Sequence, residues 1–147
     1  MYLYKFIDYL SYEKKYSIHT IRSYKSDIEG FLIFLKKNDT PIDNDLNYSF
    51  IRQWIVELAE SKISTVTINR KISSLKSYFK FLVTIGCLSK SPTEGHRNLK
   101  TKGTIVEPFS EKEIEKIFKN FSNHDVNERD KLIIEFLYCT GVRRQEL

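Results

Sequence analysis

One amphipathic stretch, residues 65–88, constrains the fold of this chain more than any other segment. Its large apolar residues recur at alternating steps of four and three, which places them on one stripe of an α-helix. The stripe consists of Ile68, Ile72, Leu75, Phe79 and Leu82. Ser64 and Gly86 are residue types that begin and end helices. The opposite face is polar and basic, and it consists of Asn69, Arg70, Ser73, Lys76, Ser77 and Lys80.

Positive charge is concentrated around this stretch. Residues 61–106 contain nine Lys and Arg against one Asp or Glu, whereas residues 1–60 contain eight against nine and residues 107–147 contain seven against nine. The net charge of +5 therefore comes from the middle of the chain. A charge run is often an ordinary solvated face, but this degree of segregation favours a polyanionic partner.

Apolar spacing predicts three further helices before the basic one, at residues 2–14, 17–36 and 49–60, with Ser17 and Ser49 as N-caps. We interpret the Phe and Tyr residues at these spacings as core residues and not as platforms for base stacking. The five glycines and three prolines among 147 residues argue against a turn-rich β fold. We therefore expect an all-α fold, in which residues 1–88 form a bundle of four to five helices.

The remainder of the chain differs in composition. Residues 89–107 are basic and poor in large apolar side chains, which indicates an extended linker. Ser110 and Glu113 then form a capping-box pattern, followed by two helices. The second is apolar on all sides at residues 132–138 and would belong inside a sizeable domain. About 40 residues are too few to enclose it, so we expect residues 108–147 to open a truncated second domain.

Several classes of protein are disfavoured by what the sequence lacks. No apolar run approaches the roughly 18 residues of a membrane span, and the first residues show no signal-peptide pattern. Cys87 and Cys139 have neither metal-site nor disulfide spacing. A cytoplasmic protein without a metal site is the simplest interpretation.

Three segments carry motifs, in order along the chain. SIHTIRSYKSDIEGFLIFL, at residues 17–35, contributes Thr20, Tyr24, Asp27, Ile28 and Phe31. The basic helix contributes Thr67, Arg70, Ile72, Ser73, Leu75, Lys76, Tyr78 and Phe79. FLYCTGVRRQEL ends the sequence and contributes Arg143. Together these segments resemble the tyrosine recombinases, the phage-integrase and Xer group, although Ser91-Pro92 stands where that family usually has Asn-Pro.

The resemblance implies a SAM-like core-binding domain at residues 1–88, a linker at 89–107 and the start of a catalytic domain at 108–147. In this family the two domains clamp double-stranded DNA, and a tyrosine forms a 3′-phosphotyrosyl bond while arginines stabilise the phosphate charge. Four protomers assemble on two DNA sites, without a metal or a nucleotide cofactor.

Arg143 matches the first catalytic arginine of the family, and we expect it to start a helix. An ordinary surface pair of Arg143 with Glu146 is the competing interpretation. The nucleophilic tyrosine and the other catalytic residues would lie beyond Leu147. We therefore expect this chain by itself to be a monomer that binds DNA without cleaving it.

Charge and position on the helices suggest which residues contact DNA. The first candidates for phosphate contacts are Arg70, Lys76 and Lys80, and the second are Arg22, Lys25, Arg97, Lys100 and Lys102. The short polar candidates are Thr20, Asn69, Ser73 and Ser77. Two alternatives remain open at this point. The chain could be a non-catalytic DNA-binding adaptor, or a helical module that binds an acidic protein.

Overall fold

The computed structural model describes residues 2–101, 103, 107–123 and 127–147, and all regular secondary structure in these residues is helical. The helices are α1 (Tyr2–Asp8), the π-helical turn η1 (Tyr9–Glu13), α2 (Ile18–Lys37), α3 (Tyr48–Glu60), α4 (Thr65–Thr84), α5 (Glu111–Asn123) and α6 (Glu128–Thr140). The predicted all-α fold is confirmed. The chain divides into two units, Met1–Lys102 and Gly103–Leu147. Within the described residues, no helix is both long and apolar enough to cross a bilayer.

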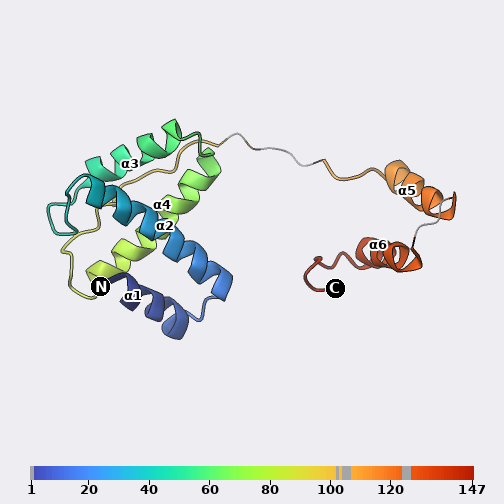
Figure 1. Ribbon diagram of the computed structural model, residues 1–147, viewed down its shortest axis with the longest axis horizontal. Helices are drawn as coiled ribbons and strands as arrows, with labels where there is room; N and C mark the ends of the chain where they lie inside the picture. Colours follow the sequence, from blue (N-terminus) through green and yellow to red (C-terminus); the bar gives the residue numbers. More distant parts are fainter. Residues whose placement is uncertain (1, 102, 104–106, 124–126) are drawn as a thin grey trace. The chain divides into compact units, whose positions relative to one another are not determined.

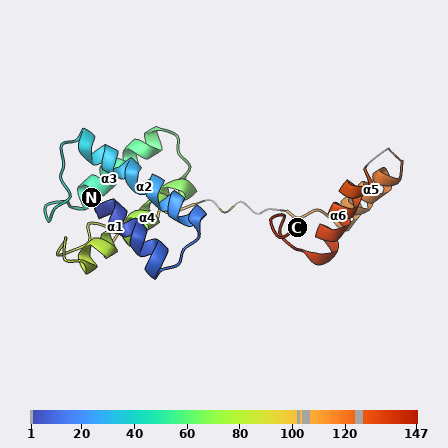
Figure 2. The ribbon, with the colours of Figure 1, turned by 60° about the horizontal axis from the view of Figure 1, so that its bottom comes forward.

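Helices α2 and α4 form the centre of the first unit. Each of them packs against both α1 and α3, and two views show all four helices gathered in one bundle (Figures 1 and 2). The five predicted stripe residues of α4 are all buried, as the sequence indicated. Tyr78 and Phe81 are buried as well, with Phe6 of α1 at ring-centroid distances of 5.3 and 5.4 Å. The buried face of α4 is wider than predicted because helices pack on more than one side of it.

The ends of α4 follow from local chemistry. Ser64 accepts a hydrogen bond from the backbone N–H of Thr67 at 3.3 Å, as expected of an N-cap. At the other end Gly86 has φ +73°, a left-handed conformation that glycine adopts at little cost. The Cys87 N–H reaches the Leu82 carbonyl at 2.9 Å, which closes the helix in a Schellman-type turn.

Two other helix ends differ from the prediction. Asn47, not Ser49, caps α3, because the backbone of Asn47 is extended and its side-chain oxygen accepts the Ser49 N–H at 2.9 Å. The expected helix over residues 2–14 is α-helical only to Asp8. It then widens into η1, where the Lys14 N–H donates to the Tyr9 carbonyl at 3.1 Å. The wider turn sets the Tyr9 ring 5.1 Å from that of Phe81.

Residues 89–100, here called the strap, are packed on the bundle and do not form a free linker. Pro92, Thr93 and His96 are buried, and Leu99 packs partly against the core. The strap begins at Ser89, whose backbone N–H and hydroxyl both donate to Asn44 in the α2–α3 loop. The first unit therefore extends past residue 88, where the sequence suggested its end. The sequence predicted a linker because this segment has few large apolar residues. Most of the strap is held by polar contacts, which composition does not reveal.

The second unit contains α5 and α6. The predicted capping box is present, because Ser110 N–H donates to the Glu113 carboxylate at 2.8 Å and Glu113 N–H returns a bond to the Ser110 hydroxyl. The rings of Phe118 and Tyr138 meet edge to face across the two helices, with centroids 6.0 Å apart. No residue of α6 is fully buried. A helix that is apolar on all sides keeps much of its surface exposed when a single helix packs against it.

Candidate nucleic-acid interface

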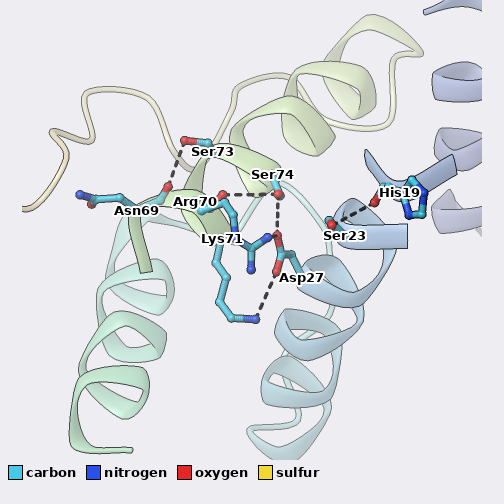
Figure 3. A network of polar contacts seen from close by, with 8 residues as sticks. All are labelled: His19, Ser23, Asp27, Asn69, Arg70, Lys71, Ser73 and Ser74. Carbon is cyan, nitrogen blue, oxygen red and sulfur yellow. Dashed lines mark hydrogen bonds and ion pairs between the residues drawn. The ribbon is translucent and has the colours of Figure 1, made fainter. Parts of the chain in front are cut away.

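The polar face of α4 meets α2 at a buried carboxylate (Figure 3). Asp27 lies on α2 and is only 1 % exposed. Its Oδ2 accepts hydrogen bonds from Arg70 Nη1 and from the Ser74 hydroxyl at 2.8 Å, and its Oδ1 accepts one from Lys71 Nζ at 3.2 Å. All three donors come from adjacent turns of α4. A buried carboxylate that is paired and hydrogen-bonded in this way is compatible with a folded core, whereas an unpaired one is not.

The two cations around Asp27 differ in exposure. The Lys71 side chain is 17 % exposed, so its ammonium is largely committed to the carboxylate. The Arg70 side chain is 50 % exposed, and Asp27 contacts one edge of its guanidinium. The cluster holds two positive charges against one negative charge. Its net charge is positive, and Arg70 is the member that solvent and a ligand can reach.

The strap lies against the same helix through two polar anchors. The Asn69 side-chain amide donates to the Leu99 carbonyl and accepts from the Leu99 N–H, both at 2.9 Å. Lys76 Nζ donates to the His96 carbonyl at 3.1 Å. Two residues that the sequence suggested for DNA contact therefore make intramolecular bonds to the backbone of the strap.

His96 anchors the middle of the strap. Its Nδ1 lies 2.9 Å from the Tyr48 hydroxyl of α3, and its Nε2 is buried without a hydrogen-bond partner among the described residues. Burial, together with the nearby Lys76 ammonium, lowers the pKa of His96 below the usual histidine value. The neutral imidazole is the form that this site favours.

Farther along α4, Ser77 and Lys80 lie beside a depression between this helix and the α1–η1 segment. The depression has a volume of about 260 Å³, and Tyr9, Lys14 and Tyr16 also line it. The Lys80 side chain is exposed. Ser73, by contrast, donates its hydroxyl to the Asn69 carbonyl one turn earlier at 3.0 Å, so this hydroxyl is engaged within the helix.

The remaining candidates lie on α2 and on the strap. Thr20 belongs to the N-terminal cap of α2, where its hydroxyl lies 2.9 Å from that of Ser17. Lys25 is 3.9 Å from Glu29 in an i,i+4 pair and lies near the Tyr4 ring. The other basic candidates on these segments, all exposed, are Arg22, Arg97 and Lys100. Lys102 lies outside the described residues.

Arg143 belongs to the second unit and lies in a turn after α6. Gly141, with φ +64°, ends the helix in a left-handed conformation. The Arg143 side chain is 86 % exposed, and its Nη1 lies 3.3 Å from the Glu146 carboxylate. The Arg143 N–H also donates to that carboxylate at 2.8 Å. One hydrogen-bonded turn follows Arg143, in which the Glu146 N–H donates to the Arg143 carbonyl at 2.8 Å.

Comparison with known proteins places the chain in a family. Residues 3–86 match the family described as phage integrase, N-terminal SAM-like domain. The chain belongs to the phage integrase family. The tyrosine recombinase XerC of Anoxybacillus flavithermus is 36 % identical over 142 residues, which cover 96 % of this chain and 47 % of that protein.

Other relatives give the same result. A tyrosine recombinase of Pseudothermotoga lettingae is 35 % identical over 99 % of this chain and 50 % of its own length. XerC of Listeria innocua is 31 % identical over 97 % and 48 %. The chain thus spans about half the length of the curated relatives it matches. No solved structure matches it.

Within this SAM-like domain, sequence reasoning missed the pairing of Asp27 with Arg70 and Lys71. Asp27 and Arg70 both belong to the motif segments, but the sequence suggested Arg70 only as a DNA contact and gave Lys71 no role. A signal was present in the sequence. Asp27 falls on the apolar stripe of α2 between Tyr24 and Phe31, and a carboxylate in that position needs a cationic partner. The role of His96 had no such signal, because His96 lies in a polar segment without helical periodicity.

Proposed function

We propose that the first unit binds double-stranded DNA as the core-binding half of a site-specific tyrosine recombinase. The polar face of α4 and the strap form the contact surface in this proposal. Membership of the phage integrase family and the names of the relatives support the recombinase role. The observation that carries the DNA surface is that side-chain hydrogen bonds hold the strap, with its exposed Arg97 and Lys100, against the basic helix α4.

Those cations share a surface because the strap is tied to α4. The bonds of Asn69 to Leu99 and of Lys76 to His96 hold the strap backbone beside the helix. Arg97 and Lys100 directly follow these anchored residues, and in this proposal their charges act on DNA together with that of Arg70. Lysine and arginine contacts to phosphates supply most of the sequence-independent affinity for DNA. In this proposal Asn69 and Lys76 act by holding the strap.

For the second unit we propose that Arg143 is the first catalytic arginine of the parent enzyme. A guanidinium with this exposure can approach the non-bridging oxygens of a scissile phosphate, where fixed positive charge stabilises the transition state. The attacking tyrosine, which would form the 3′-phosphotyrosyl intermediate, is assigned to the part of the relatives that this chain does not span. The 147-residue chain alone is therefore expected to bind duplex DNA as a monomer without cleaving it.

A charge-matched comparison of variants tests the DNA surface. In the first variant Lys80, Arg97 and Lys100 are each replaced by alanine, because the structure shows all three exposed. The control replaces Lys5, Lys36 and Arg52, which are also exposed and lie on α1, α2 and α3. Both variants lower the net charge by the same amount. Binding to a labelled duplex is measured by fluorescence anisotropy from 50 to 300 mM salt.

We expect the first variant to bind at least about tenfold more weakly than the control at moderate salt. Its log–log salt slope should be lower by about 2.7, or 0.9 for each phosphate that the variant no longer neutralises. Circular dichroism should show equal helicity in both variants. Equal affinities would mean that binding follows net charge alone, and absence of binding by the unmodified chain would reject the function itself.

A further inference from the structure

The buried Asp27 carboxylate between α2 and α4 makes more hydrogen bonds than are needed to link two helices. Asp27 uses both of its oxygens and accepts from three side chains of α4, two of them cationic. The Ser74 hydroxyl, itself buried, fixes the carboxylate from one side. Lys71 fixes it from the other. The carboxylate is therefore held in one orientation, and whatever it contacts at the surface is oriented as well.

Arg70 is the group that this carboxylate orients at the surface. Half of its side chain is exposed, and one edge of the guanidinium donates to Asp27. A guanidinium carries five N–H donors in a rigid plane, so holding one edge sets the direction of the others. An arginine fork with a set direction matches two oxygens of a phosphate, whereas a freely moving arginine loses conformational entropy on binding.

We propose that Asp27 is a positioning residue, which holds the Arg70 guanidinium in place for a DNA phosphate. The inference rests on the proposed function, because it assumes that the polar face of α4 meets DNA. Asp27 itself is buried and does not touch the ligand. Lys71, which is mostly buried, balances the carboxylate charge, so that the cluster as a whole stays positive and attracts phosphate.

Electrostatics alone makes the opposite prediction for loss of this carboxylate. Replacing Asp27 by asparagine raises the net charge of the chain by one, and a more positive protein binds a polyanion more tightly. If Asp27 positions Arg70, the same substitution weakens binding despite the added charge. The sign of the change therefore separates the two roles.

The test compares Asp27→Asn with Glu29→Gln in the full chain. Glu29 lies two residues farther along α2 and is exposed, and its substitution changes the net charge by the same amount. Duplex affinity is measured from 50 to 300 mM salt for both variants. We expect Asp27→Asn to bind about fivefold more weakly than the parent chain, with a salt slope lower by about 0.9 because one phosphate is no longer neutralised. Glu29→Gln should bind equally or more tightly.

Asp27→Asn binding as tightly as Glu29→Gln would overturn the proposal. A second variant, Arg70→Lys, keeps the charge and removes the fork. Both substitutions disrupt the same contact between Asp27 and Arg70. Their effects on the binding free energy should therefore not be additive when they are combined. Multiplied losses would show that the two residues act independently and would also overturn the proposal.

Folding of each variant is checked by circular dichroism and urea unfolding at the binding temperature. If Asp27→Asn does not fold, Arg70→Lys decides. Weaker binding at unchanged net charge would support a positioned fork, and unchanged binding would reject it. Failure of the proposed function is recognised separately, because the unmodified chain would then not bind the duplex at all.

Discussion

At the scale of single residues, several polar and basic side chains of α4 bond within the protein and are not free to contact a ligand with all their donors. Residues 61–93 contain no Asp or Glu, yet four side chains of this stretch make intramolecular hydrogen bonds. They are Asn69, Arg70, Lys71 and Lys76. Arg70 and Lys71 donate to the buried Asp27 carboxylate. Asn69 and Lys76 bind the backbone of the strap. A basic stretch therefore does not by itself identify the residues that contact a ligand.

Adjacent serines on α4 offer a test of the buried cluster. Ser74→Ala should lower the free energy of unfolding by about 1–2 kcal/mol, because it removes a donor from the buried Asp27 carboxylate. Ser73→Ala is the matched control, since the exposed Ser73 hydroxyl only returns to its own helix at the Asn69 carbonyl. That substitution should cost under about 0.5 kcal/mol. Urea unfolding of both variants measures the difference, and equal losses would contradict the role assigned to the cluster.

His96 should make the stability of the first unit depend on pH. Burial lowers its folded-state pKa below the ordinary value of 6.5, so the unfolded chain takes up a proton first as the pH falls. The stability that the neutral His96 contributes is fully present above the pKa of this residue in the unfolded chain. It is lost as the pH falls from there towards the pKa of His96 in the folded chain. Urea unfolding at pH 7.5 and 5.5 should show a larger loss for the unmodified chain than for His96→Gln. Identical losses would rule out this linkage.

At the scale of elements, local chemistry accounts for helix boundaries better than for connections. Ser64, Gly86 and the Ser110–Glu113 box act where the sequence indicated, because caps need only residues within one turn. The strap has no regular helix, and its position depends on partners 20 to 48 residues away in the sequence. Composition therefore described it as a linker although it is packed.

Loosening the strap should be detectable by proteolysis. Asn69→Ala removes both hydrogen bonds to the Leu99 backbone, at a cost of about 1–2 kcal/mol to local stability. Trypsin should then cleave faster after Arg97 and Lys100, because cleavage follows the population of the opened segment. Asn38→Ala is a suitable control, since its side-chain amide donates to the Phe34 carbonyl at the end of α2, away from the strap. Similar cleavage of both variants would argue against the anchor.

At the scale of the whole molecule, the two units have separate chemistry. The first has a closed core and gathers the candidate DNA contacts, whereas the second has a helix whose apolar residues remain largely exposed. The side chain of Leu132 on α6, for example, is 65 % exposed. We therefore expect urea unfolding of the chain to report mainly on the first unit.

Shortened chains should locate the end of the first unit. A chain of residues 1–102 should unfold cooperatively at the urea midpoint of the full chain, because the core lies within it. A chain of residues 1–88 should be less stable by at least about 2 kcal/mol, since it lacks buried Pro92, Thr93 and His96 and the bonds to Asn69 and Lys76. Equal urea midpoints for the two shortened chains would mean that the first unit ends at residue 88.

The sequence by itself determined the helices, the buried stripe of α4, most of the caps and the family. The helices, the stripe and the caps depend on residues within one element, so helical spacing and local residue type report them directly, whereas motifs in three segments indicated the family. Only the tertiary structure decided that Asp27 pairs with Arg70, that the strap covers α4 and that Tyr48 holds His96. Those partners are 43, 30 and 48 residues apart in the sequence. Where two helices cross is set by the packing of the whole core, which no local pattern contains.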